Sequence, residues 1–91
     1  MTGASITDPP AVVTLLSRSG CHLCEAARVV VAEQATAAGV GWTEIDVDSD
    51  PDLRADFGDL VPVVLVDGAE HAHYRVDPTR LRAALQTRPR S

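Results

Sequence analysis

Two cysteines, Cys21 and Cys24, are the residues in this chain best suited to chemistry. They are its only cysteines, and helical spacing would bring their sulfur atoms within bonding reach after small side-chain rotations. An apolar run over residues 11–16 precedes them, and a turn over 17–20 connects the run to Cys21. A strand that ends in a turn and starts a helix at a Cys-x-x-Cys sequence indicates thiol–disulfide exchange. A pair of inert, half-buried cysteines is the alternative interpretation.

The predicted helix start gives the two thiols different environments. Cys21 would lie among unpaired backbone N–H groups at the positive end of the helix dipole, which favours its thiolate. An ordinary thiol with a pKa of about 8.5 is only about 3% ionised at pH 7, so a lowered pKa matters for reactivity. Cys24, one turn later, should face the sheet and be less exposed. We therefore predict that Cys21 attacks a disulfide and Cys24 resolves it, with Arg18 and His22 modulating the pKa or redox potential of Cys21.

The length and composition limit the kinds of partner. The 91 residues suffice for one domain, and the net charge of −5 argues against nucleic acid or an anionic membrane as the main partner. No apolar run approaches the ~20 residues of a membrane span, and the first residues lack the pattern of a secretory signal. We therefore expect a cytoplasmic protein, a monomer without nucleic-acid or membrane partners, in a compartment that keeps dithiols reduced.

The first half of the chain predicts a strand, a helix and a second strand. Residues 11–16 are almost continuously apolar, as in a strand buried on both faces. Residues 21–38 have helical periodicity, and Gly39 marks the end of this helix. Residues 41–47 alternate between apolar and polar and predict a strand parallel to the first. The apolar stripe of the helix consists of Cys24, Ala27, Val30, Val31, Ala35 and Ala38.

The second half predicts a helix followed by a hairpin. Asp50 and the proline after it are typical of a helix start, and this short helix should end near residues 57–58. Residues 61–66 form a third apolar strand. The Asp67-Gly68 pair predicts a tight turn into an antiparallel fourth strand over residues 69–75.

A last helix completes the expected fold. It begins with Asp77 as cap and Pro78 in the first turn, and Leu81 and Leu85 should be buried. The resulting order, βαβαββα, predicts an α/β fold in which a four-stranded mixed sheet has helices on both faces. The expected domain organisation is a flexible lead-in at 1–10, one domain at 11–86 and a flexible tail at 87–91.

This order of elements resembles the thioredoxin superfamily, and the small size resembles its glutaredoxin-like branch. The resemblance covers about residues 11 to 86 and is carried by Cys21 and Cys24 at the helix start and by Val61-Pro62, which opens the third strand. It implies a thioredoxin-like fold of the glutaredoxin type. It also implies a cis Val61-Pro62 bond facing the dithiol, which leaves the backbone of Val61 free to pair with an extended substrate. Arg18 stands where many glutaredoxins have a lysine.

The resemblance further implies where a thiol cofactor or substrate binds, and Arg75 and Asp77 lie in that region. We expect them to recognise a disulfide-containing protein or the mixed disulfide of a small thiol. This chain has His-Leu between its cysteines, where glutaredoxins typically have Pro-Tyr, and it lacks the Gly-Gly pair that helps hold glutathione. We expect no tightly bound cofactor. The sequence leaves three candidates for the reductant: glutathione, another low-molecular-weight thiol or a protein.

Two other functions stay open. Cys21 is a candidate ligand in a metal or iron–sulfur site, either with a thiol cofactor across a dimer or with histidines. His71 and His73 alternate on the fourth strand and, with the two cysteines, would complete a Cys2His2 set, but the spacing matches no usual zinc finger, and our prediction contains no metal site. The third possibility is a thioredoxin-fold adaptor whose dithiol is redox-inactive.

Overall fold

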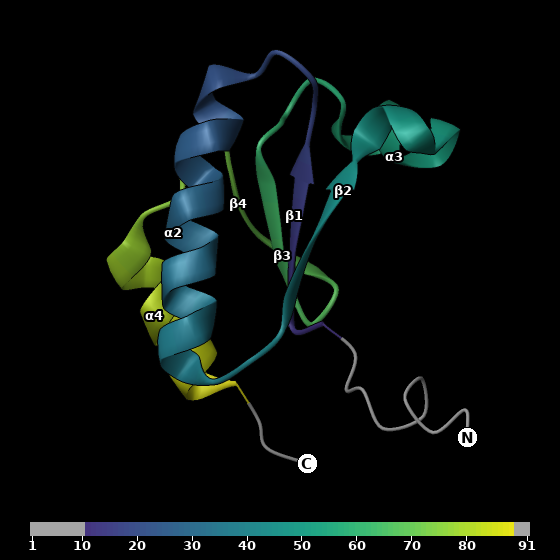
Figure 1. Ribbon diagram of the computed structural model, residues 1–91. Coiled ribbons are helices and arrows are strands. Elements are labelled where there is room, and N and C mark those ends of the chain that lie inside the picture. Colours follow the sequence, from purple (N-terminus) through teal and green to yellow (C-terminus); the bar gives the residue numbers. More distant parts are fainter. Residues whose placement is uncertain (1–10, 89–91) are drawn as a thin grey trace, which may run out of the picture.

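The computed structural model describes residues 11–88 and contains a four-stranded mixed sheet in the order β2-β1-β3-β4 (Figure 1). β1 and β2 are parallel, β3 is antiparallel to β1, and β4 is antiparallel to β3. The predicted α/β fold is therefore confirmed, including the parallel first pair and the hairpin. The strands are β1 (Val13–Ser17), β2 (Trp42–Asp46), β3 (Val63–Val66) and β4 (Ala69–His73).

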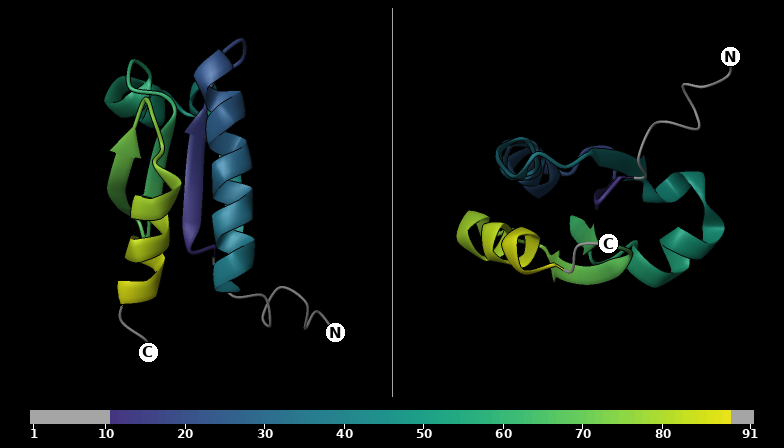
Figure 2. Two further views of the ribbon diagram at one scale, coloured as in Figure 1. Left: turned by 90° about the vertical axis from the view of Figure 1, so that its left-hand side faces the viewer. Right: turned by 90° about the horizontal axis from the view of Figure 1, so that it is seen from below.

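The helices cover both faces of the sheet. α2 (His22–Ala38) and α4 (Pro78–Thr87) lie side by side on one face, and α3 (Pro51–Phe57) lies on the opposite side (Figure 2). A short 3-10 turn, η1 (Val47–Ser49), connects β2 to α3 and was not predicted. Within residues 11–88, no helix has the length and apolar character needed to cross a membrane.

Local signals in the sequence account for the helix ends. Asp50 and Asp77 cap α3 and α4, and Pro51 and Pro78 occupy the first helical positions, where the missing N–H costs nothing. Gly39 ends α2 with a left-handed φ of 72°, a conformation that glycine adopts without steric penalty.

The hairpin between β3 and β4 also follows its sequence signal. Asp67 and Gly68 both have positive φ, 52° and 84°, as a two-residue hairpin turn requires. A bulge between Val64 and Leu65 shifts the register, so that Val63 pairs with His73 while Val66 pairs with Ala69.

The core consists of two clusters, one on each face of the sheet. Valine and leucine fill most of both clusters, and alanine contributes to the one toward α2 and α4, since the chain has only three aromatic residues. Toward α2 and α4 the buried residues are Val13, Leu15, Ala27, Val31, Ala35, Val64, Leu81 and Leu85. Toward α3 they are Leu16, Val47 and Val63, with Leu53 and Phe57 packed against them. The predicted burial of Leu81 and Leu85 is confirmed.

One position of the predicted helix stripe is wrong. Ala38 is exposed because it lies in the last turn of α2, next to the Gly39 cap. Gln34 is buried instead, and its Oε1 atom accepts a hydrogen bond of 3.4 Å from Nε of Arg82 on α4. This polar contact between the two helices offsets the burial of the amide.

Several predicted boundaries also differ from the structure. The first strand runs over Val13–Ser17, and the third begins only at Val63, after a proline that cannot donate to the ladder. The fourth strand ends at His73, since Tyr74 has a φ of 64°. The last helix extends to Thr87, beyond the predicted domain end at 86. Residues 1–10 and 89–91 of the predicted lead-in and tail lie outside the described residues.

Candidate redox site

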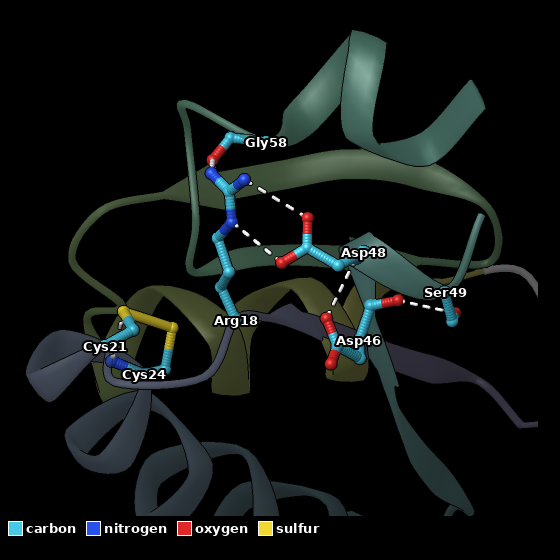
Figure 3. Close-up of polar contacts among 7 residues, drawn as sticks. All are labelled: Arg18, Cys21, Cys24, Asp46, Asp48, Ser49 and Gly58. Carbon is cyan, nitrogen blue, oxygen red and sulfur yellow. Dashed lines mark hydrogen bonds and ion pairs between the residues drawn. A yellow bond between two sulfur atoms is a disulfide. The ribbon is translucent and has the colours of Figure 1, made fainter. Parts of the chain in front are cut away.

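Cys21 and Cys24 lie where the loop after β1 enters α2, and they form a disulfide with a Cα–Cα distance of 5.2 Å (Figure 3). Gly20, with a φ of 77°, turns the chain just before the first cysteine. The N–H of Cys21 donates to the carbonyl oxygen of Arg18 at 3.3 Å, which closes the turn. Cys21 itself caps α2 in an extended conformation, as a residue at a helix start should.

The two sulfurs differ in exposure in the predicted sense. Cys24 is 1% exposed, whereas Cys21 is only half-buried. The backbone N–H of Cys24 donates to the Sγ atom of Cys21 at 3.2 Å. In the reduced protein, this donor and the other free N–H groups of the first turn would favour a thiolate at Cys21. The attacking and resolving roles of the two residues stay predictions.

Arg18 does not point at the sulfurs. Its Nε and Nη2 atoms donate to the two carboxylate oxygens of Asp48 at 3.0 and 3.1 Å, and Nη1 donates to the carbonyl of Gly58 at 3.1 Å. Figure 3 shows the side chain leading away from the disulfide toward these partners. The guanidinium thus connects the dithiol loop to η1 and to the end of α3. Its predicted effect on the pKa of Cys21 stays a prediction, as does that of His22, the exposed first residue of α2.

The Val61-Pro62 bond is cis, as the resemblance predicted. Pro62 is buried and directly precedes β3, whose first residue, Val63, pairs with Leu16 near the end of β1. The proline therefore lies at the end of the sheet where β1 runs into the dithiol loop. Among residues 11–88, no backbone hydrogen bond uses the N–H or C=O group of Val61.

Tyr74 was not singled out from the sequence, yet it connects two loops at this end of the molecule. Its backbone N–H donates to the carbonyl of Pro62 at 2.8 Å, and its hydroxyl donates to the carbonyl of Asp59 at 3.2 Å. The ring also packs edge-on against His73, with the ring centroids 4.8 Å apart. The sequence does not indicate this role. Residues other than glycine seldom adopt a positive φ such as the 64° of Tyr74, so a tyrosine is not a recognised signal for such a turn.

A small, mainly apolar pocket of about 150 Å³ opens beside the dithiol. Leu23, which lies between the two cysteines, forms one wall, and Tyr74 forms part of another. Both side chains are substantially exposed, 43% and 47%. The lining residues are Leu23, Ala26, Ala27, Val30, Tyr74, Arg75 and Val76. This pocket could hold an apolar group attached to the attacked sulfur.

Arg75 and Asp77, the two polar candidates, have different contacts. The carboxylate of Asp77 accepts hydrogen bonds from the N–H groups of Thr79 at 2.8 Å and Arg80 at 3.3 Å, so it caps α4. Arg75 is exposed and lines the apolar pocket, close enough to meet a charged group at its rim. The structure thus brings Arg75 to the side of the dithiol that carries Leu23, and engages Asp77 in the helix start.

A polar contact beneath α2 also escaped the sequence analysis. The hydroxyl of buried Ser17, at the end of β1, donates to Glu44 on β2 at 2.7 Å. Arg28 on α2 binds the same carboxylate through two nitrogens, at 2.6 and 2.7 Å. These donors, the arginine foremost, hold the pKa of Glu44 below its usual value, although partial burial opposes them. The contact joins β1, β2 and α2 next to the dithiol loop.

The two histidines of β4 are not brought to the cysteines. Nδ1 of His73 lies 2.8 Å from a carboxylate oxygen of Glu70, and burial and the charge of Arg80 lower the pKa of His71. In the part of the chain that the structure describes, no three Cys, His, Asp or Glu side chains gather as a metal site would require.

Comparison with known proteins identifies relatives of the whole domain. The family model for a glutaredoxin-like domain (DUF836) matches residues 12–86. A Mycobacterium tuberculosis protein named "Uncharacterized protein Rv0508" is 46% identical over 78 residues, which is 80% of each chain. The crystal structure of target protein XcR50 from X. campestris has 34% identity and a TM-score of 0.68, covering 85% of this chain and 99% of that one.

More distant solved structures share the fold alone. The holo form of glutaredoxin C1 from Populus tremula x tremuloides superimposes with a TM-score of 0.54 at 21% identity, covering 84% of each chain. This likeness agrees with the mixed sheet and its flanking helices. With the family match over most of its length, the chain belongs to the glutaredoxin-like domain family.

Proposed function

We propose that this protein is a thiol–disulfide oxidoreductase in which Cys21 attacks a substrate disulfide and Cys24 resolves the intermediate. The observation that carries the proposal is the disulfide itself, between a half-buried cysteine that caps α2 and a buried cysteine one turn later. An accessible sulfur among helix N–H groups suits the nucleophile, and a shielded sulfur within bonding distance suits the resolving thiol.

The reaction follows from this arrangement. In the reduced protein, the Cys21 thiolate attacks one sulfur of the substrate, the substrate S–S bond breaks, and the other sulfur leaves as a thiolate. Cys24 then loses its proton to solvent and attacks the sulfur of Cys21, which releases the second substrate thiolate. Two electrons pass from the dithiol to the substrate, and the Cys21–Cys24 disulfide remains.

The loops around the dithiol suit an extended substrate. The free peptide groups of Val61 could pair with the backbone on one side of the substrate cysteine, next to Pro62. The pocket beside Leu23 would accept an apolar group, and Arg75 a charged one. A disulfide-containing protein and the mixed disulfide of a small thiol both meet these requirements.

We further propose that the protein works as a monomer in the cytoplasm, without a tightly bound cofactor. An external thiol must then reduce the Cys21–Cys24 disulfide after each turnover, and glutathione or another low-molecular-weight thiol would serve. Turnover of mixed disulfides prepared with different small thiols, each supplied with its own thiol as reductant, identifies which one is used.

The proposal is tested with single-cysteine variants. Reduced Cys24→Ser should form a stable mixed disulfide with a peptide disulfide, seen as an added mass, while Cys21→Ser should form almost none. The wild-type protein should instead release both peptide thiols. Its own mass should fall by two hydrogens as the Cys21–Cys24 disulfide forms. Formation of the adduct only through Cys24 would reverse the roles, and reaction by neither variant nor wild type would favour a redox-inactive adaptor.

A further inference from the structure

A second and larger cavity, about 470 Å³, lies along β4 and the start of α4. Unlike the pocket beside Leu23, it is mainly polar. Its lining residues are Glu70, His71, Ala72, His73, Arg75, Asp77 and Arg80. Arg75 lines both this cavity and the apolar pocket, so the two are neighbours.

The two carboxylates in this cavity already have partners. Glu70 contacts the ring nitrogen of His73 at 2.8 Å. Asp77 accepts hydrogen bonds from the backbone of Thr79 and Arg80 at the start of α4. Among the described residues, neither acid is bound to an arginine side chain, so the donors of Arg75 and Arg80 are not used by these two carboxylates.

The two arginines in the cavity lack such partners. Within the part of the chain that the structure describes, neither Arg75 nor Arg80 forms an ion pair, and both are exposed. Arg18, Arg28 and Arg88 are each bound to a carboxylate of the same chain. The guanidinium groups of Arg75 and Arg80 are therefore available to a ligand, and a planar carboxylate is the group that best matches them.

The extent of the cavity favours a peptide over a single small acid. β4 is an edge strand, so one side of its backbone lacks a neighbouring strand. From Glu70 to His73 the edge strand spans roughly 10 Å, given a rise of about 3.3 Å per residue. A segment of about four residues in extended form fits this length, and acidic side chains at its end would meet Arg75 and Arg80.

We propose that this cavity binds an acidic peptide segment of the substrate protein, next to the cysteine whose disulfide is attacked. Arg75 and Arg80 bind its carboxylates and thereby select acidic partners for the dithiol. This inference rests on the proposed function in one respect, namely that the bound peptide belongs to a substrate. Binding of the peptide itself requires no redox step.

The first test measures binding with the disulfide closed. Oxidised ¹⁵N-labelled protein is titrated with a five-residue peptide that has three glutamates and no cysteine, with its glutamine counterpart, and with free glutarate. We expect the acidic peptide to bind about three- to tenfold more tightly than the glutamine peptide, and to shift amide signals of residues 70–80. Equal affinity of the two peptides, shifts confined to other regions, or glutarate binding as tightly as the acidic peptide would each overturn the proposal.

Matched variants locate the binding charges. Arg75→Gln/Arg80→Gln should abolish the preference for the acidic peptide, and Arg54→Gln/Arg82→Gln, with the same change of net charge, should retain it. Arg54 lies on α3 and Arg82 further along α4, and neither lines the cavity. Loss of the preference in both double variants would show a general charge effect and contradict a site.

Reduction rates separate the two proposals. Two peptide disulfides are compared, one with the acidic segment beside its cysteine and one with the glutamine segment. If the protein reduces neither, the proposed function fails while the binding result stands. If it reduces both at equal rates, the cavity does not select substrates and this inference fails.

Discussion

The arginines on the two sides of the Cys21–Cys24 disulfide differ in what neutralises their charge. On the side of η1 and α3, Arg18 binds both oxygens of Asp48 and the carbonyl of Gly58. On the side of β4 and α4, Arg75 and Arg80 line a cavity without an ion pair to any residue in 11–88. One side is closed by contacts within the chain, and the other is open to a ligand.

The difference shows that residue type and distance along the chain do not decide what an arginine does. Arg18 is the closest arginine to Cys21 in sequence, yet its donors are used to fix the loop to its neighbours. Arg75 is 54 positions away by residue number and keeps its donors free beside Leu23. Bidentate binding to a carboxylate leaves a guanidinium few donors for a ligand. Arg18 thus positions the dithiol loop, whereas recognition of a substrate by Arg75 is what we propose.

The largest effect is expected from Gly58→Ala on the positioning side. A Cβ atom at Gly58 would lie 2.5 Å from the backbone oxygen of Arg54, so the end of α3 must shift and carry the carbonyl that Arg18 binds. We expect a loss of about 1–3 kcal/mol in the free energy of unfolding, measured by urea denaturation. An equally stable variant would show that this loop adapts freely and does not hold Arg18. The control is Ala55→Gly, at an exposed position of the same helix. It shows how much of the free energy of unfolding is lost when only helix propensity is reduced.

The Arg18–Asp48 pair offers the next test. Arg18→Gln and Asp48→Asn should each lower the melting temperature by roughly 3–6 °C, since the pair joins the dithiol loop to η1. We expect the pKa of the Cys21 thiol, measured from alkylation rates, to rise only slightly in Arg18→Gln and to fall in Asp48→Asn, which leaves the guanidinium unpaired. A rise of more than about one unit in Arg18→Gln would show that Arg18 acts directly on the thiol.

Glu44 on the edge strand β2 and His71 on the edge strand β4 should make stability respond to pH in different ranges. The pKa of Glu44, bound by Arg28, is lowered from 4.5, so the unfolded chain takes up the proton first and stability is lost as pH falls below that value. Burial lowers the pKa of His71 from 6.5, so stability starts to fall at a higher pH, near 6.5. The urea concentration at the midpoint of unfolding should depend less on pH in each variant than in the wild type. We expect this below pH 5 for Glu44→Gln and between pH 7 and 5 for His71→Gln. The matched control is Glu33→Gln, which removes an exposed carboxylate on α2. If this variant also weakened the pH dependence of the urea midpoint, the assignment of that dependence to Glu44 and His71 would be wrong.

Much of the fold could be predicted because its signals are local. A cap and a proline at Asp50 and Asp77, the glycine after α2 and the Asp67-Gly68 turn each specify a boundary within a few residues. The cysteine pair could be predicted for the same reason, since three positions on one helix turn determine its geometry. The almost continuous apolar runs of β1 and β3 then left few ways to assemble the sheet.

The surroundings of the site could not be predicted because they depend on contacts between distant residues. Arg18 and Asp48 are 30 positions apart, and the neighbours of Arg18 in sequence do not reveal this pair. The burial of Gln34 depends on where α4 packs, and helical periodicity within α2 carries no information on that packing. The unpaired state of Arg75 and Arg80 is also a property of the assembled surface, so the second cavity appears only in three dimensions.

The smallest effect is expected from Tyr74→Phe, which tests whether the two sides are independent. The variant keeps the ring beside the apolar pocket and removes only the hydroxyl that donates to Asp59 at 3.2 Å. We expect a loss of about 0.5 kcal/mol in the free energy of unfolding and an increase in KM of less than twofold for a peptide disulfide, with kcat unchanged. The alkylation rate of Cys21 should stay as in the wild type, because the hydroxyl contacts neither the start of α2 nor Arg18 itself. A changed alkylation rate would mean that the loop around Tyr74 and the dithiol loop are coupled through Asp59, which directly follows Gly58 in the chain.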